Sequence, residues 1–220
     1  AKVLSTFIAP MEFSSIHELT FGSTKVYMMS YDAFNPKNYF NILTAAELDI
    51  INGFGHIKRH REYLAVRILK DKIFPNKNIL YNKVGAPYFE DDSDCQISIS
   101  HANNVVAFAK ASYQVGLDLE PVSEKASKLK HKFLNDQELL ELDIDDQLEI
   151  TKAWSAKEAL YKMAGRKKII FKTDLILTKI TDDLWEGKII SENQTTIVPL
   201  TFSQSGKMIL TINPSEGRNE

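Results

Sequence analysis

The chain has 220 residues, of which 44% are hydrophobic and 25% charged, a balance typical of a globular protein with one large core or two smaller ones. Its formal net charge of −2 argues against a dedicated nucleic-acid binder, since such proteins are usually basic. No apolar run approaches the roughly 18 residues of a membrane span, no signal peptide is recognisable, and the single cysteine excludes an intrachain disulfide. We therefore expect a cytoplasmic protein that contacts neither nucleic acid nor membrane.

The first half of the sequence predicts a strand, two helices and then short strands. Residues 25–31 alternate as a strand does, and Thr44 with Glu47 forms a capping-box pattern at the start of a helix. A second helix is expected at 56–74. Short strands are expected at 78–83, 87–91, 96–102 and 105–111, with a tight turn at 103–104.

The second half repeats this order of strand, helices and strands. It begins with a strand at 114–122, and the last of its helices is expected to end at Gly165. The helices are expected at 123–134, 135–142 and 146–165, and the strands that follow at 168–180, 184–190, 195–203 and 207–214. The tail, 215–220, is expected to be frayed. Two such units predict a duplicated α+β fold of about 110 residues per unit.

Two carboxylates interrupt the apolar strand at 114–122. Residues two apart share one face of a strand, so Asp118 and Glu120 point the same way and their leucine neighbours point the other way. Two adjacent carboxylates repel each other unless a cation lies between them, and oxygen ligands of this kind suit Mg²⁺. The alternative is a one-sided strand with both acids facing water.

The helix at 146–165 carries a polar row. Trp154, Glu158 and Lys162 are four residues apart and therefore lie on one face, opposite an apolar face. The simplest interpretation is a surface ion pair between Glu158 and Lys162, worth about 0.3–0.5 kcal/mol.

Together, "GLDLE" at 116–120 and "WSAKEALYK" at 154–162 resemble the paired signature of the 4′-phosphopantetheinyl transferases. "ISISHANN" at 97–104 resembles the segment that precedes the first motif in this family, and "RHREYLAVRIL" at 59–69 resembles its Arg-rich helix. The length is similar to that of the monomeric, two-lobed branch. The resemblance implies two similar lobes, 1–112 with coenzyme A phosphate contacts and 113–220 with the metal-binding and catalytic motifs, related by a pseudo-two-fold axis. Each lobe would pack an antiparallel sheet on helices.

The resemblance also implies a reaction, in which the phosphopantetheine arm of coenzyme A is transferred to a serine of an apo carrier protein and 3′,5′-ADP is released. Asp118, Glu120 and Glu158 would hold Mg²⁺. Glu158, or Glu120 by way of a water, would take the serine proton, and Lys162 would stabilise charge on the phosphate.

Contacts to coenzyme A are implied for five residues. His101 and Ser100 belong to the segment before the first motif, Lys157 belongs to the second motif, and Arg61 and Arg67 lie on the Arg-rich helix. The alternatives are a histidine that is satisfied at a strand end and a helix face that is merely solvated.

Other functions stay open at this point. Many family members carry lysine where this chain has Ala86, in "GAPYF", which leaves a non-catalytic coenzyme A-binding module as the main alternative. An interaction protein, in which both motifs are only structural, is a third. The basic run at 123–132 is either a solvated helix face or a surface that an acidic carrier protein approaches.

Overall fold

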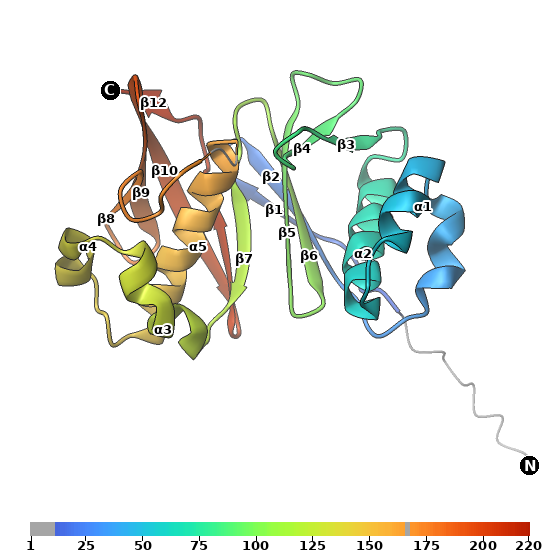
Figure 1. The fold of residues 1–220 in the computed structure, drawn as a ribbon, viewed down its shortest axis with the longest axis horizontal. Coiled ribbons are helices and arrows are strands. Elements are labelled where there is room, and N and C mark those ends of the chain that lie inside the picture. Colours follow the sequence, from blue (N-terminus) through green and yellow to red (C-terminus); the bar gives the residue numbers. More distant parts are fainter. Residues whose placement is uncertain (1–11, 166–167) are drawn as a thin grey trace, which may run out of the picture.

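A computed structural model describes residues 12–165 and 168–220 and shows an α+β fold with two main antiparallel sheets. The sheets stand side by side in the middle of the molecule (Figure 1), with α1 and α2 outside one and α3, α4 and α5 outside the other. The fold class predicted from the sequence is confirmed in these terms. The pseudo-two-fold relation and the boundary after residue 112 stay predictions, although the strands do change sheet between β6 and β7.

Sheet I contains four strands in the order β1-β2-β6-β5. Its strands are β1 (His17–Phe21), β2 (Thr24–Ser30), β5 (Gln96–Ala102) and β6 (Val105–Ala111), and a separate ribbon pairs β3 (Ile79–Tyr81) with β4 (Pro87–Phe89). The helices of this half are a 3₁₀ helix, η1 (Pro36–Ile42), and the α-helices α1 (Ala45–Asn52) and α2 (Ile57–Ile73). The capping box of Thr44 and Glu47 is present, and Asn103 and Asn104 both adopt positive φ in the β5–β6 turn, as predicted.

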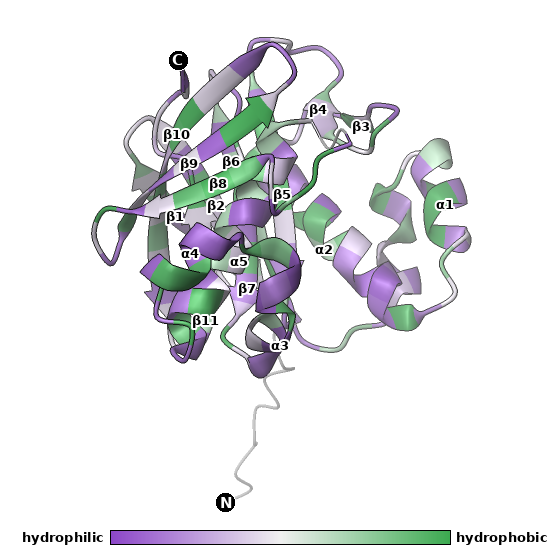
Figure 2. Cartoon of the chain, turned by 60° about the vertical axis from the view of Figure 1, so that its left-hand side comes forward, coloured by the Kyte–Doolittle hydropathy of each residue, from purple (hydrophilic) through white to green (hydrophobic). Residues whose placement is uncertain are grey.

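Sheet II runs in the order β7-β11-β10-β9-β8, and a short sixth strand, β12, pairs with β10. Its strands are β7 (Leu117–Pro121), β8 (Leu175–Lys179), β9 (Leu184–Ser191), β10 (Gln194–Ser205), β11 (Met208–Ile212) and β12 (Arg218–Asn219). Its helices are α3 (Glu124–Phe133), α4 (Asp136–Glu141) and α5 (Gln147–Met163). The ribbons of α2 and α3 mix hydrophilic and hydrophobic residues (Figure 2), as expected of helices that bury one face.

Four elements differ from the sequence prediction. The tail is not frayed, because β12 pairs with β10 and Lys188 forms an ion pair with Glu220 at 3.0 Å. The strand β1 and the 3₁₀ helix η1 were not predicted, and the strand expected at 168–180 begins only at Leu175. Residues 166 and 167 lie outside the described part of the chain.

The two sheets are joined by serine side chains between β5 and β7. Oγ of Ser98 accepts the backbone N–H of Leu117 at 3.0 Å, and Oγ of Ser100 accepts that of Leu119 at 3.1 Å. These hydroxyls take the place of backbone carbonyls as partners of an edge strand. A buried apolar cluster with residues from both sheets, among them Ala107 and Leu210, packs at this junction. No helix in the described residues combines the length and the apolar character needed to span a membrane.

Candidate active site

The close packing of α5 on β7 positions the site, and Gly116 makes it possible. A Cβ atom at Gly116 would lie 2.1 Å from the carbonyl oxygen of Ala159 and 2.6 Å from Cγ of Met163. Ala156 and Ala159 are fully buried, so small residues on the helix also permit the approach. The polar row of α5 is thereby brought against the carboxylates of β7.

Asp118 is buried at the centre of this arrangement. Its Oδ1 accepts hydrogen bonds from Lys162 Nζ at 2.9 Å and from Ser100 Oγ at 3.1 Å, and its Oδ2 accepts one from Ser155 Oγ at 2.9 Å. Lys162 Nζ also donates to the carbonyl of Leu117 at 2.7 Å and to Ser100 at 3.2 Å. The structure therefore brings together residues of α5, β7 and β5 at the junction of the two sheets.

Glu120 lies near the end of β7 and is half-buried. Its Oε1 accepts a hydrogen bond from Nε1 of Trp154 at 3.0 Å. Burial raises the pKa of the Glu120 carboxyl and the charge of Asp118 raises it further, while the Trp154 hydrogen bond and the charges of Lys125 and Lys162 oppose the increase. Burial therefore makes the charged form of Glu120 less favourable than that of an exposed glutamate.

Glu158 is half-buried on α5, four residues from both Trp154 and Lys162. Throughout the described residues, no group of three or more His, Cys, Asp or Glu side chains is arranged to hold a metal ion, so the predicted carboxylate triad is not preassembled. The donor set nevertheless suits a hard cation, because Asp118 and Glu120 supply carboxylate oxygens from one face of a strand and a cation would stabilise the charged form of Glu120, which burial disfavours.

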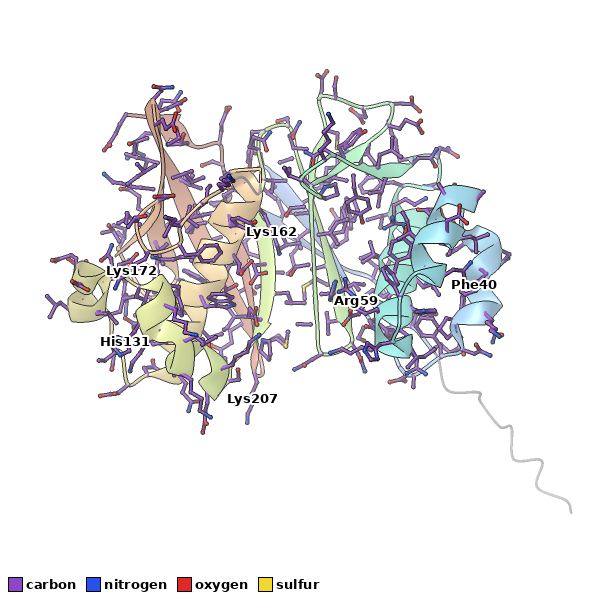
Figure 3. The ribbon with its side chains drawn as sticks, in the orientation of Figure 1. Phe40, Arg59, His131, Lys162, Lys172 and Lys207 are labelled. Carbon is purple, nitrogen blue, oxygen red and sulfur yellow. The ribbon has the colours of Figure 1, made fainter. Side chains whose placement is uncertain are left out.

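A cavity of about 430 Å³ opens on the sheet I side of this cluster. Its lining combines cationic groups with aromatic rings, from α2 and the loop before it, β5 and the β3–β4 ribbon: Phe54, Arg59, Tyr63, Arg67, Tyr81 and His101. Glu62 also lines the cavity and lies 3.5 Å from Arg59 and 3.7 Å from His101. Burial lowers the pKa of His101, and the charges of Arg59 and Lys162 lower it as well, whereas Glu62 raises it. Figure 3 shows Lys162 and Arg59 projecting from α5 and α2 toward the strands between them.

The two arginines predicted to bind coenzyme A differ in placement. Arg67 lines the cavity but is buried, and it donates to Glu47 Oε1 at 2.6 Å and to the hydroxyls of Tyr63 and Tyr81. Arg61 does not line the cavity and donates instead to the carbonyl of Phe34 at 2.8 Å.

Arg59, which was not predicted as a contact, takes the place expected for Arg61. The helical period of the sequence could have indicated this, because Arg59 and Arg67 are eight residues apart and lie on one face of α2, whereas Arg61 points to another face.

The structure contradicts the prediction that Lys157 faces phosphate. Its side chain is 0% exposed, and Nζ donates to Glu138 Oε2 at 2.7 Å and to the carbonyls of Phe133 and Phe171 at 2.7 and 2.9 Å. All three donors of the ammonium group are therefore used inside the protein.

Ser100 is buried, and its hydroxyl is occupied by Asp118, Lys162 and the N–H of Leu119. Its contact with the cofactor stays a prediction. The loop that carries Ala86 is closed by Asn82, whose Oδ1 accepts the N–H of Ala86 at 2.9 Å, and its next residue, Pro87, lines the cavity.

Comparisons with known proteins agree with the motif resemblance. A family model described as the 4′-phosphopantetheinyl transferase superfamily matches residues 114–204, the segment that contains both motifs. Over 112 residues the chain is 31% identical to "4′-phosphopantetheinyl transferase gsp" of Aneurinibacillus migulanus, and this alignment covers 48% of the chain and 45% of that protein. The chain thus matches about half the length of this curated relative. The segment that carries both motifs therefore matches a transferase family, as the motifs predicted.

Proposed function

We propose that the protein is a Mg²⁺-dependent transferase that moves the phosphopantetheine arm of coenzyme A onto a serine of an apo carrier protein and releases 3′,5′-ADP. The observation that carries the proposal is the position of the cluster of Asp118, Glu120 and Lys162 near the cavity. Ser100 contacts Lys162 and Asp118 from one face of β5, and the next residue, His101, lines the cavity on the other face of this edge strand. The charge of Lys162 lowers the pKa of His101, which is consistent with the two sites lying close together. This arrangement suits a ligand whose phosphorylated nucleoside lies in the cavity and whose diphosphate lies at the neighbouring cluster.

The cavity fits the nucleotide end of coenzyme A. Phe54, Tyr63 and Tyr81 offer aromatic surface to a base. Arg59 offers positive charge to a phosphate and His101 offers a ring N–H, and a phosphate would compete with Glu62 for both. Protonation of His101 would be favoured by a bound phosphate, which offsets the lowering of its pKa by burial.

The reacting groups would then lie at the sheet junction. The serine oxygen forms a bond to the phosphorus that carries the pantetheine chain, and the bond from that phosphorus to the bridging diphosphate oxygen breaks. The serine proton passes to Glu158, or to Glu120 by way of a water. Lys162 stabilises the negative charge on the departing 3′,5′-ADP. A divalent cation held by Asp118, Glu120 and Glu158 would supply further neutralisation of the diphosphate.

The acceptor would approach over the end of β7 and α3. Lys125, Lys128 and Lys132 are exposed on α3, and Lys207 is exposed in the β10–β11 turn. The backbone carbonyl of Lys207 accepts the N–H of Val122 at 2.7 Å, so this turn lies beside the end of β7. Figure 3 shows Lys207 and His131 at the end of the molecule where α3 lies. An acidic carrier surface would be complementary to these lysines.

The test is the loading of carriers, followed by intact mass. Purified protein is incubated with Mg²⁺, coenzyme A and a panel of apo carrier proteins, and a mass gain of one phosphopantetheine group is expected on at least one of them. Asp118→Asn and Lys162→Met should abolish the gain while their melting curves show a folded protein. Lys172→Met, an exposed change away from the site, should load normally. Absence of any gain with folded wild-type protein across the panel would refute the proposal.

The second candidate is a coenzyme A-binding module without catalysis, which Ala86 favours because a cation found in many relatives of this type is missing. Titration calorimetry with coenzyme A separates the two candidates. Binding of coenzyme A without transfer to any carrier indicates the module.

A further inference from the structure

We propose that the indole N–H of Trp154 fixes the orientation of the Glu120 carboxylate, so that Trp154 is a positioning residue of the site. This inference rests on the proposed function, and it assigns a role to a motif residue that contacts neither the diphosphate nor the reacting serine. Its basis is the 3.0 Å hydrogen bond from Trp154 Nε1 to Oε1 of Glu120. A donor on one oxygen sets the plane of the carboxylate and directs the second oxygen, Oε2, away from the indole.

The carboxylate needs such a partner because of where it lies. Glu120 is at the end of β7, where a long side chain has several rotamers, and its neighbour on the same face, Asp118, repels it. The hollow beside Glu120 and Trp154 has a volume of about 10 Å³, room for no more than one water molecule. Glu120 therefore cannot turn aside into this hollow, and the indole N–H determines which of the remaining orientations it takes.

The indole is itself held by two aromatic rings. Phe133 at the end of α3 packs edge-on against it, with ring centroids 5.1 Å apart, and Phe171 in the loop after α5 packs at 5.7 Å. Phe133 precedes α5 in the sequence and Phe171 follows it, and both rings restrict rotation of the Trp154 side chain.

Lys157 binds the backbone of both aromatic residues that hold the indole. The two backbone carbonyls that its ammonium group binds belong to Phe133 and Phe171, the same residues whose rings pack on Trp154. The buried Lys157 thus fixes the backbone of both aromatic neighbours. A continuous set of contacts runs from Lys157 through the aromatic rings to Trp154 and from there to Glu120.

The variant that tests this is Trp154→Phe, which keeps an aromatic ring between Phe133 and Phe171 but removes the N–H donor. Removing a residue that orients a metal ligand typically weakens metal affinity or activity 10–100-fold, so we expect at least about a tenfold increase in the Mg²⁺ concentration needed for half-maximal transfer. The KM for coenzyme A should change much less. Binding of Mn²⁺ as a probe metal, followed by electron paramagnetic resonance without a carrier protein, should weaken by a similar factor.

The matched control is Trp185→Phe. Trp185 is 1% exposed, packs edge-on against Phe202 at 5.2 Å, and its Nε1 is buried with no hydrogen-bond partner among the described residues. The same chemical change there removes no hydrogen bond, so its Mg²⁺ requirement and Mn²⁺ affinity should equal those of the wild type. If Trp154→Phe does not fold, 3-benzothienylalanine at position 154, which replaces the N–H by sulfur in a ring of the same shape, provides the same test.

The outcomes separate this inference from the proposed function. Transfer by the wild type together with unchanged metal dependence and Mn²⁺ affinity in Trp154→Phe overturns the positioning role and leaves the function intact. Loss of transfer with unchanged Mn²⁺ affinity also overturns it, since the defect then lies elsewhere. A wild type that binds no Mn²⁺, with or without coenzyme A, overturns the inference whatever its activity.

Discussion

Replacement of Lys157 by methionine should unfold the protein more easily rather than remove a phosphate contact. Methionine keeps the aliphatic part of the side chain but leaves the Glu138 carboxylate, which is 1% exposed, without its cation. Glu138 would keep only the backbone N–H groups of Leu177 and Asn135 as partners, and the carbonyls of Phe133 and Phe171 would lose theirs. Breaking one partner of a buried ion pair costs about 3–5 kcal/mol.

For a protein of this size, 1 kcal/mol corresponds to about 2–4 °C, so the melting temperature of Lys157→Met should fall by about 6–20 °C. Urea denaturation gives the free energy of unfolding, and thermal melting gives the second measure. Adding Glu138→Gln removes the unpaired buried charge and should recover about half of the lost free energy of unfolding. Replacing both partners of a buried ion pair costs less stability than replacing one of them. Lys172→Met is the control, since Lys172 pairs at 3.6 Å with an Asp136 side chain that is 96% exposed and should change stability by less than about 1 kcal/mol. If Lys157→Met were as stable as the wild type and yet failed in transfer, the ammonium group would have to face a ligand and the assignment drawn from the structure would be refuted.

Three further changes test the packing, the electrostatics and the partner surface. Gly116→Ala should destabilise the fold by about 1–3 kcal/mol in urea denaturation, because its Cβ would meet the α5 backbone, whereas Gly55→Ala meets no atom within 4 Å and should be close to neutral. Since folding raises the pKa of Glu120, the stability that this carboxyl contributes is complete below the unfolded pKa of about 4.3 and is lost as pH rises through the folded value. In metal-free buffer, Glu120→Gln should therefore be more stable than the wild type at pH 7 but not at pH 4. An equal effect at both pH values would contradict this assignment. Charge reversal of Lys125 and Lys207 together should lower kcat/KM for an acidic carrier about tenfold at low ionic strength and much less at high salt, with KM for coenzyme A unchanged; a loss independent of salt would exclude electrostatic attraction as its cause.

The fold was predictable wherever local chemistry decides it. The Thr44 capping box, the asparagine turn at 103–104 and the two long helices all follow from side chains within a few residues of one another. The elements that were missed depend on distant partners instead. The two-residue strand β12 exists because β10 is long enough to pair beyond β11, and two residues are too few to show a pattern. The strand β1 is a mostly exposed edge strand that, among the described strands, pairs with β2 alone. Its alternation is short, with only Leu19 and Phe21 partly buried.

The site was predictable to the extent that its motifs lie on regular elements. Asp118 and Lys162 were expected together, and the structure places them 2.9 Å apart. The prediction for Lys157 was wrong because it followed the family motif and not the helical period. It lies four residues after Ala153 and three before Leu160, both fully buried, so the period alone assigns it to the apolar face. A lysine on that face needs a buried anion, and Glu138, on another helix, is a partner that no local pattern reveals.

The residues of the two motifs therefore fall into two groups, which point in different directions and have different roles. Those on the polar row of α5 and on the polar face of β7 meet at the junction of the sheets, where they can act on a ligand. Lys157 points the opposite way, yet its ammonium group holds the two aromatic residues that restrain Trp154. If Trp154 positions Glu120 as proposed, a buried motif lysine contributes to the site through packing, without facing it. This explains why a single helix combines a buried charge, which costs stability on its own, with the polar row that faces the site.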